Sequence, residues 1–403
     1  MLERGRPVSD VLWYLGDEIS HKPDQECDFP EGYKYDYCNP DVLLNRLSVR
    51  DGKIVTPEGL SYSMMWIPEN KRMLPETLEK IYELIKAGAV VVAEAPRSIA
   101  TLSGGEEAQK RFDAAVEAIW GEVPPCETAR IGKGIIDSDT DIKNALARHG
   151  IKQDVKGGVR WIHRNVKGAD WYFVTPKKQS SFKGSVAFSA EGAVELWDPV
   201  TGRMSPVKAE SRDGYTVVDL DMPKAGSCFV VFNRKEKHRN PEPKVYGDAV
   251  QLSGPWKISF PEGWGVPADT TVSQLLPWCD MMSSPEAKAF SGKAVYSTRF
   301  TVGADKVGKP MLLDLGKADM IAVVRINGKE MSPIWCQPYS VDIGEYIKEG
   351  VNDLEIDVVS TWFNRLVFDA SLPEGDRKTW VIAGPKADKQ LRPAGLMGPV
   401  TLK

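Results

Sequence analysis

Residues 75–93 read PETLEKIYELIKAGAVVVA and combine a helix signal with a strand signal. Pro75 suits the first helical position, and Gly88 suits the helix end. Between them, apolar residues recur at three- and four-residue spacing, at Leu78, Ile81, Tyr82 and Ile85. The apolar run 89–93 follows as a strand, and another strand candidate, 61–67, precedes the helix. The order strand, helix, strand predicts a parallel sheet.

The rest of the first third of the chain repeats these signals. The apolar run 8–15 predicts a buried strand that ends just before Asp17 and Glu18. Asn39 predicts a helix N-cap, because a proline follows it at the first helical position. Further helices are expected over about 106–120 and 139–149, the second opened by Asp139. This alternation predicts a doubly wound α/β domain.

From about residue 156 the hydrophobic period changes to two, which indicates short antiparallel strands separated by turns such as 198–202. The stretch 233–244 is charged, contains prolines and lacks apolar residues, which is typical of a linker. In the following all-β part, Asn327 and Gly328 predict a tight hairpin turn. The expected division is an α/β domain at 1–155, a small antiparallel β-sandwich at 156–234, a linker at 235–249 and a jelly-roll β-sandwich at 250–403.

Composition restricts the function classes. The chain has 403 residues, of which 42% are apolar and 27% charged, as in ordinary soluble globular proteins. With 52 basic and 56 acidic side chains, the formal net charge is −4, so we expect no nucleic-acid partner. The longest apolar run, 87–93, is far shorter than the ~20 residues that span a bilayer, so we expect no membrane partner. The start of the chain shows no signal-peptide pattern, and sequence alone leaves the localisation open.

The cysteine and histidine patterns predict no metal or redox motif. The six cysteines are scattered without C-x-x-C spacing, so we expect free thiols; Cys27 with Cys38 is the one pair that could form a disulfide. Four dispersed histidines make no histidine-rich site. Glycine-rich nucleotide loops and the zincin, α/β-hydrolase and EF-hand motifs are also missing. We expect no cofactor, and acid–base chemistry would fall to carboxylates.

The first candidate site combines acids and tyrosines near the carboxyl ends of the predicted parallel strands, where ligands of such sheets bind. Its candidate substrate-facing residues are Asp17, Glu18, Tyr33, Tyr35, Asp36 and Asn39. Carboxylates and tyrosine hydroxyls could hold sugar hydroxyls, but a glycosidase needs two carboxyls at roughly 5 or 6.5–9.5 Å, which sequence does not show. Alternatively, the tyrosines pack on the sheet and Asn39 only caps a helix.

The second candidate site lies in the last domain and could form an aromatic platform with polar neighbours. Its residues are Trp335, Tyr339, Trp362, Asn364 and Arg365. Aromatic faces stack on the apolar face of a pyranose, which favours carbohydrate binding. Alternatively, the tryptophans belong to the core, as large aromatic residues often do.

Several strings resemble one enzyme family. Residues 30–37, 41–47 and 51–53 resemble the segment that follows the catalytic barrel in glycoside hydrolase family 106, the α-L-rhamnosidases, and 195–202 and 227–232 are similar to the same enzymes. Residues 324–329, 338–343 and 395–400 look like the galactose-binding-type jelly roll shared with family 2 glycosidases. The α/β domain resembles the flavodoxin-like, glutamine-amidotransferase-like domains found after other glycosidase barrels, without their nucleophilic cysteine.

The resemblance implies a multidomain α/β plus all-β chain from which the catalytic (β/α) barrel is absent. Enzymes of this family carry their acid and base carboxylates and a calcium-assisted sugar site on that barrel. No catalytic residue and no calcium ligand set can therefore be carried over to positions of this chain. The implied partners are a rhamnose-containing glycan and an upstream barrel of the same or a neighbouring polypeptide, in a periplasmic or secreted enzyme.

Three functional hypotheses follow. The first is the accessory C-terminal part of an α-L-rhamnosidase-like glycoside hydrolase acting on plant or microbial polysaccharide, inactive alone. The second is a freestanding carbohydrate-binding or assembly protein without catalysis. The third is a small independent enzyme that uses the acids near Glu18.

Overall fold

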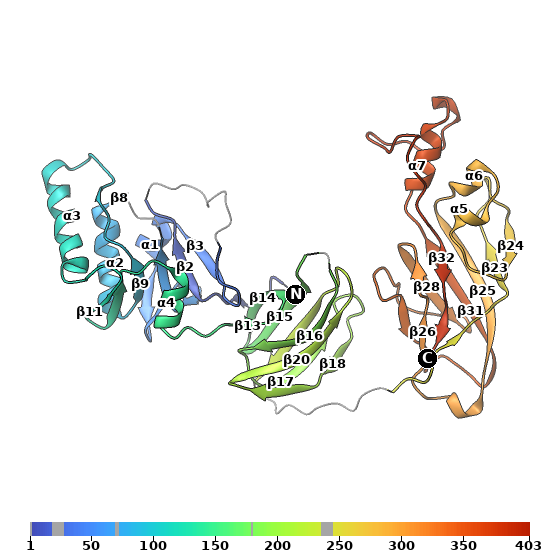
Figure 1. Ribbon diagram of the computed structural model, residues 1–403, viewed down its shortest axis with the longest axis horizontal. Coiled ribbons are helices and arrows are strands. Elements are labelled where there is room, and N and C mark those ends of the chain that lie inside the picture. Colours follow the sequence, from blue (N-terminus) through green and yellow to red (C-terminus); the bar gives the residue numbers. More distant parts are fainter. Residues whose placement is uncertain (1, 18–27, 69–71, 179, 235–244) are drawn as a thin grey trace. The chain divides into compact units, whose positions relative to one another are not determined.

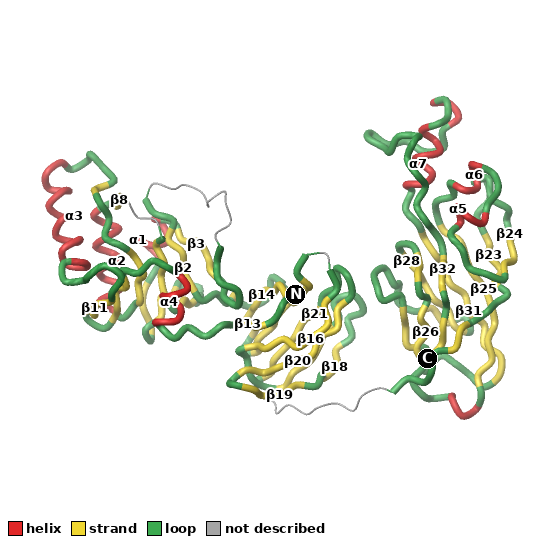
Figure 2. The backbone as a smooth tube through the Cα atoms, in the orientation of Figure 1, coloured by secondary structure: helices red, strands yellow, loops and turns green. Residues whose placement is uncertain are grey.

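The computed structural model describes residues 2–17, 28–68, 72–178, 180–234 and 245–403. It divides into two compact units, Met1–Pro241 and Glu242–Lys403. Strands dominate both units (Figure 2), and the described residues form no closed barrel. None of the helices in these ranges is long and apolar enough to cross a membrane. Of the expected linker 235–249, only 245–249 is described.

The first unit begins with a six-stranded sheet that has helices on both faces (Figure 1). Its strands, in spatial order, are β11 (Thr128–Ile131), β12 (Gly134–Asp137), β9 (Val90–Ala93), β7 (Met64–Ile67), β2 (Val11–Tyr14) and β3 (Tyr35–Cys38). Neighbours pair in parallel except β11 with β12. The parallel pairing of β7 with β9 confirms the prediction from residues 61–93.

The helices of this sheet cover two separate cores. They are α1 (Pro40–Arg46), α2 (Pro75–Ala87), α3 (Gly105–Trp120) and α4 (Ile142–Arg148). Because successive side chains of a strand point to opposite faces, Leu12 and Tyr14 of β2 pack with α1, α2 and α3, whereas Val11 and Trp13 pack with α4. Both faces are therefore buried, as the continuous apolar run in this strand predicts.

The predicted helix caps are partly confirmed. The side chain of Asn39 caps α1 by accepting the Val42 N–H at 2.9 Å. The cap of α4 is Asp141 rather than the predicted Asp139, because the Asp141 carboxylate accepts the first free helical N–H groups. The Asp139 carboxylate instead accepts the Asp141 N–H and the side chain of Arg148.

The predicted strand 61–67 is interrupted at Ser63, whose N–H donates to the Asp10 carbonyl. Its first part is β6 (Ser61–Tyr62), which forms a small antiparallel sheet with two earlier strands, β4 (Ser48–Arg50) and β5 (Lys53–Val55). Two short strands pair beside the main sheet, β8 (Arg72–Met73) and β10 (Ser98–Ile99). Cys38 is a buried free thiol, and Cys27 lies outside the described residues.

The first unit ends in a β-sandwich of two antiparallel sheets. One sheet has the order β1 (Arg6–Pro7), β14 (Val159–Val166), β15 (Ala169–Pro176), β21 (Cys228–Asn233), β17 (Ala193–Trp197) and β18 (Met204–Pro206). The other has the order β13 (Val155–Lys156), β16 (Phe182–Phe188), β20 (Tyr215–Met222) and β19 (Ala209–Arg212). The pairing of β1 with β14 makes the start of the chain an edge strand of this sandwich.

The second unit is also built on two antiparallel sheets around one core. The larger sheet has the order β24 (Asp269–Val272), β23 (Trp256–Ser259), β25 (Lys293–Val302), β31 (Gly350–Val359), β28 (Ile321–Ile326) and β29 (Lys329–Glu330). The smaller has the order β22 (Val250–Gln251), β33 (Thr401–Leu402), β26 (Leu312–Asp314) and β30 (Ser340–Asp342), and a short pair is formed by β27 (Lys317–Ala318) and β32 (Leu396–Gly398). Its helices are α5 (Trp278–Met281), α6 (Pro285–Lys288) and α7 (Phe363–Ala370).

The turn between β28 and β29 confirms the hairpin predicted at Asn327 and Gly328. Both residues have positive φ values, 51° and 79°, which is the backbone that a two-residue hairpin with the native strand twist requires.

Candidate functional site

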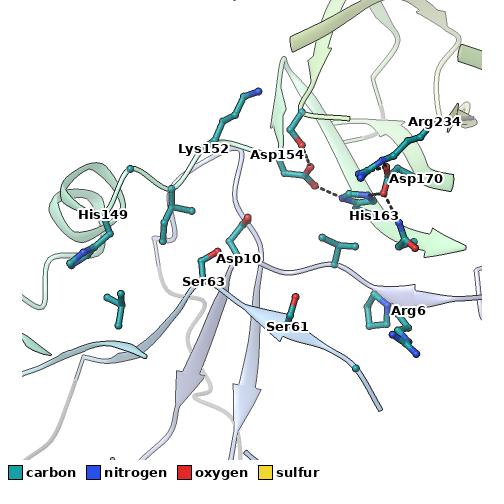
Figure 3. Close-up of a pocket in the computed structure, with 18 residues that line it drawn as sticks. Arg6, Asp10, Ser61, Ser63, His149, Lys152, Asp154, His163, Asp170 and Arg234 are labelled. Atoms are coloured by element: carbon teal, nitrogen blue, oxygen red, sulfur yellow. Dashed lines mark hydrogen bonds and ion pairs between the residues drawn. The ribbon is translucent and has the colours of Figure 1, made fainter. Parts of the chain in front are cut away.

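A polar cavity of about 620 Å³ lies in the first unit, where the segments 59–63 and 149–154 approach β1 and neighbouring parts of the sandwich. Figure 3 shows its lining. The polar side chains that it labels are Arg6, Asp10, Ser61, Ser63, His149, Lys152, Asp154, His163, Asp170 and Arg234. Charged and hydroxyl groups therefore predominate on its wall.

His163 lies between two carboxylates on the sandwich side of the cavity (Figure 3). It belongs to β14 and is only 6% exposed. Its Nδ1 is 2.9 Å from Asp154 and its Nε2 is 3.3 Å from Asp170. The ring stacks on Tyr172, with 4.0 Å between the ring centroids. Both ring nitrogens are therefore occupied.

The two carboxylates are fully bonded. Besides His163, Asp154 accepts hydrogen bonds from a ring of neighbouring side chains, Trp161 (3.3 Å), Tyr172 (2.8 Å) and Ser189 (2.7 Å). Asp170 accepts from Asn165 at 2.9 Å and from the Arg234 guanidinium at 2.7 Å. Two carboxylates, one imidazolium and one guanidinium then balance in charge, as buried ions require.

Protonation states follow from these contacts. Burial opposes the charged form of His163, but the hydrogen bonds and charges of Asp154 and Asp170 outweigh it and raise its pKa to about 9. Burial would raise the pKa of both carboxyls, yet their bonds to His163 and the other donors hold each pKa below its usual range. The imidazolium is therefore charged at neutral pH and lacks the free lone pair that a general base needs.

Asp10 differs from these groups. It lies in the turn before β2, and one carboxylate oxygen accepts the Lys34 N–H at 2.9 Å. Burial, with the nearby charge of Asp154, raises its pKa to about 7 despite that hydrogen bond and the charges of His163 and Lys53. No other hydrogen bond to Asp10's carboxyl occurs among the described residues. Asp10 is therefore the cavity carboxyl that can exchange a proton or contact a ligand near neutral pH.

The opposite end of the cavity is held by a second buried network. Asp137, at the end of β12, is completely buried and lies 2.8 Å from His149 Nε2 and 2.6 Å from Arg148. These contacts join α4 to the sheet and fix the segment that follows it, which lines the cavity.

This arrangement can bind polar groups but lacks the parts of a glycosidase centre. Such a centre needs two carboxyls on either side of the bond to be cleaved, and among the described cavity residues only Asp10 keeps an unbonded carboxyl oxygen. A calcium ion would need several oxygen ligands, and the part of the chain that the structure describes contains no group of three or more acidic, histidine or cysteine side chains able to hold a metal.

In the first sequence-predicted cluster, Asp17 supports the fold. Its carboxylate accepts hydrogen bonds from the Tyr14 hydroxyl (2.6 Å), the Leu74 N–H (2.8 Å) and the Thr77 hydroxyl (2.7 Å), so it fixes the start of α2. Glu18 lies outside the described residues. Asp17 is thus not free to act on a substrate.

The remaining members of this cluster are divided. Asp36 accepts from the Tyr62 hydroxyl at 3.0 Å, and Asn39 caps α1. Tyr33 donates to the Ile151 carbonyl at 3.1 Å, and the ring of Tyr35 packs against Trp13. Tyr33 and Tyr35 line one cavity together, which is separate from the one described above.

In the second unit, the structure exposes the two tryptophans of the second predicted cluster and buries Asn364 and Arg365. Trp335 and Trp362 are 56% and 47% exposed, whereas Tyr339 donates to the Met320 carbonyl. Asn364 is buried and bonds both the N–H and the carbonyl of Arg392. Arg365 is 1% exposed and pairs with Glu286 and Asp369, so it cannot face a ligand.

Sequence reasoning did not select the residues of the polar cavity, which are Asp10, Asp154, His163, Asp170 and Arg234. One signal could have found part of it. In the predicted strand 161–163, His163 alternates with Trp161 and so takes an inward position, where a histidine needs buried partners. The partners themselves come from other strands and loops.

Comparison with known proteins places this architecture in a family. The sequence profile of the α-L-rhamnosidases of glycoside hydrolase family 106 matches residues 1–211, more than half of the chain. A rhamnosidase structure from Novosphingobium sp. PP1Y is 31% identical and superimposes with a TM-score of 0.88 over 99% of this chain and 39% of that one. A Formosa agariphila protein named "Putative beta-glucuronidase" is 29% identical over 252 residues.

The chain spans only part of these relatives, 39% of the Novosphingobium rhamnosidase and 20% of the Formosa protein. Their coverage of this chain is 99% and 60%. On the family match and the fold together, the chain belongs to glycoside hydrolase family 106, the α-L-rhamnosidase family.

Proposed function

We propose that this chain is the accessory, non-catalytic part of an α-L-rhamnosidase-like glycoside hydrolase that acts on a plant or microbial polysaccharide. Family membership and the 99% coverage of this chain by the rhamnosidase structure support the relationship. The catalytic barrel would correspond to the portion of that structure, beyond the matched 39%, that this chain does not span.

The observation that carries the non-catalytic role is the bonding of the carboxyls. Glycoside hydrolysis needs one carboxyl as acid and another as base or nucleophile. Both carboxylate oxygens of Asp154 and of Asp170 accept hydrogen bonds from neighbouring side chains. Asp17 accepts hydrogen bonds at the start of α2, and one oxygen of Asp36 accepts the Tyr62 hydroxyl. Asp10 alone, among the described cavity residues, has an oxygen available.

The domain structure that we propose has an amidotransferase-like α/β domain at 1–155, a small β-sandwich at 156–234 and a galactose-binding-like jelly roll at 250–403. Three groups of cores support it. The α/β cores draw on residues 12–136 and 11–146, the sandwich core on 155–232 and the last core on 256–400. Each would bury its own apolar surface, as an independent domain does.

An exposed apolar segment after α7 supports an assembly role. Trp380 and Ile382 are 82% and 90% exposed, and Val381 between them is 44% exposed. Consecutive apolar side chains at the surface mark interaction sites. We propose that this exposed segment contacts the catalytic part of the same or a neighbouring polypeptide.

Hydrolysis of an aryl α-L-rhamnoside tests this function. The purified chain should release no aglycone above the blank, while the Novosphingobium rhamnosidase serves as the active control. Turnover that disappears in Asp10→Asn or Asp36→Asn would overturn the proposal.

The exposure of Trp335 and Trp362 favours one alternative, a freestanding carbohydrate-binding protein. Calorimetric titration with rhamnose-containing oligosaccharides separates the two roles. Binding that weakens in Trp335→Ala or Trp362→Ala, with an unchanged unfolding curve, would support the alternative; no heat with any such glycan would count against it.

A further inference from the structure

A second cavity in the first unit, of about 690 Å³, combines aromatic rings with positive charge. Its aromatic lining consists of Phe29, Tyr33, Tyr35 and Trp161. Its charged lining consists of Lys34, Lys156, Arg160, Lys177 and a single carboxylate, Glu31. This cavity, the basic aromatic cleft, is therefore cationic in a protein whose formal net charge is −4.

The segment 152–156 separates the basic aromatic cleft from the polar cavity. Lys152 and Asp154 line the polar cavity, whereas Gln153 and Val155 line the cleft, an alternation that holds for residues 152–155 and ends at Lys156, which also lines the cleft. A backbone hydrogen bond joins this segment to the loop at Gly32, because the Asp154 N–H donates to the Gly32 carbonyl at 2.7 Å. Gly32 has a φ of 90°, and a Cβ there would lie 2.8 Å from the Val155 carbonyl oxygen, so the close approach requires glycine.

Two cations of the cleft have no ionic partner. The Lys34 ammonium lies 4.4 Å from the centre of the Trp161 ring, and neither it nor the Arg160 guanidinium pairs with a carboxylate in the described ranges. Burial lowers the pKa of Lys34, and the neighbouring charge of Arg160 acts in the same direction, against the charges of Asp154 and Asp10. An anion placed beside these two cations would relieve both effects.

The other two cations are already engaged. Lys177 pairs with Glu31 at 2.5 Å, and Lys156 lies 4.1 Å from the centre of the Tyr215 ring. The unbalanced charge is therefore concentrated at Lys34 and Arg160. Arg160 pairs with Thr175 of β15 on one edge of β14, whereas on the other edge β1 pairs only with Asn165 and Arg164.

We propose that the basic aromatic cleft binds an anionic saccharide, whose acid group lies against Lys34 and Arg160 and whose ring packs on the tyrosines. Guanidinium and ammonium groups bind carboxylate and sulfate through charge-assisted hydrogen bonds. Half-buried aromatic rings provide the apolar contact that a pyranose needs. Hydrolysis of a rhamnoside does not itself require an anionic ligand at this cleft. The proposed binding site is therefore independent of whether the chain is catalytic.

A single-stranded nucleic acid could also use rings and cations, but nucleic-acid binders carry basic surfaces over a whole domain. This chain has an acidic excess overall. An anionic sugar, which is small and carries one charge for each ring, fits a confined cleft better.

Isothermal titration of the whole chain tests the proposal, with trigalacturonate as the probe and its fully methyl-esterified form as the neutral counterpart. We expect the acid form to bind at least about tenfold more tightly, because a charge-assisted contact to two cations is lost in the ester. Raising the salt concentration should weaken the acid form only. A sulfated galactan oligosaccharide reports whether a sulfate ester serves instead of a carboxylate; tight binding of either anion supports the proposal.

The variants are Arg160→Gln, which removes an exposed guanidinium, and Lys34→Met, which removes the ammonium beside Trp161 but keeps an unbranched side chain of similar shape. Each should weaken binding by roughly five- to tenfold, while Lys183→Gln, an exposed lysine on β16, should leave it unchanged. Equal affinity for acid and ester, undiminished binding by Arg160→Gln, or tighter binding of oligothymidylate would each overturn the proposal.

Discussion

Replacing Asp10 with asparagine isolates the effect of one half-buried charge. The amide oxygen of asparagine can still accept the Lys34 N–H, so the hydrogen bond that holds the turn before β2 is retained. What disappears is a carboxyl whose pKa is raised from 3.8 to about 7, chiefly by burial. The variant therefore differs from the native chain mainly above the pH at which Asp10 ionises.

The sign of the effect follows from proton linkage. A raised folded-state pKa means that the folded chain binds the proton more tightly, so the stabilisation is complete below about pH 4 and is lost as the pH rises through 7. A shift of about three pKa units corresponds to roughly 4 kcal/mol, an upper limit for the change in unfolding free energy. The unfolding free energy of Asp10→Asn, measured relative to that of the native chain, should therefore increase by about 2 to 4 kcal/mol between pH 4 and pH 8.

Urea unfolding read by pulse proteolysis measures this change, with fragments from residues 2–234 reporting on the first unit. The difference in unfolding free energy between variant and native chain is compared at the two pH values. Any pH-independent change in stability that the asparagine amide causes then cancels. Asp221→Asn, which removes an exposed carboxylate paired with Lys183, is the control and should change little at either pH. A difference between Asp10→Asn and the native chain that is independent of pH, or that falls as the pH rises, would refute the assignment.

Three further predictions concern the buried networks. His163→Gln removes a group whose pKa is raised to about 9. The stabilisation from this shift, about 3 kcal/mol, is complete below about pH 6.5 and is lost as the pH rises through 9. The difference in unfolding free energy between the native chain and the variant, measured by urea unfolding, should therefore disappear over that range. Asp17→Ala removes the acceptor at the start of α2 and should cost about 1–2 kcal/mol, seen as faster hydrogen exchange in that helix. Arg365→Met leaves the buried Asp369 without its cation and should destabilise the second unit by about 3 kcal/mol in thermal unfolding.

Local signals in the sequence predicted much of the α/β architecture. The periodicity of 75–93, the cap at Asn39 and the turn at Asn327 act over a few residues, and the structure confirms each of them. The edge strand β1 was not predicted, because its partner in β14 is about 160 residues away. Long-range pairing of this kind leaves no periodic trace in a two-residue strand.

The polar cavity could not be assembled from the sequence for the same reason. Its central ion network brings His163 and Asp170 together through the register of β14 with β15. Arg234 joins the network just after β21, and Asp154 joins it from the segment before β13. Selection by residue type favoured acids that follow a strand, such as Asp17, whose carboxylate proves to be used by the fold. Burial and hydrogen-bond saturation decide which carboxyl is available, and neither is visible in a single sequence.

The rate at which the purified chain hydrolyses an aryl α-L-rhamnoside tests the central claim most directly. With Asp10 as the single carboxyl of the described polar cavity that keeps an unbonded oxygen, we predict release of aglycone at the rate of the protein-free blank. Glycosidases that possess both carboxyls turn over at rates typical of enzymes, roughly 1–10³ per second. A rate in that range, proportional to the concentration of the chain and abolished by Asp10→Asn, would contradict the account.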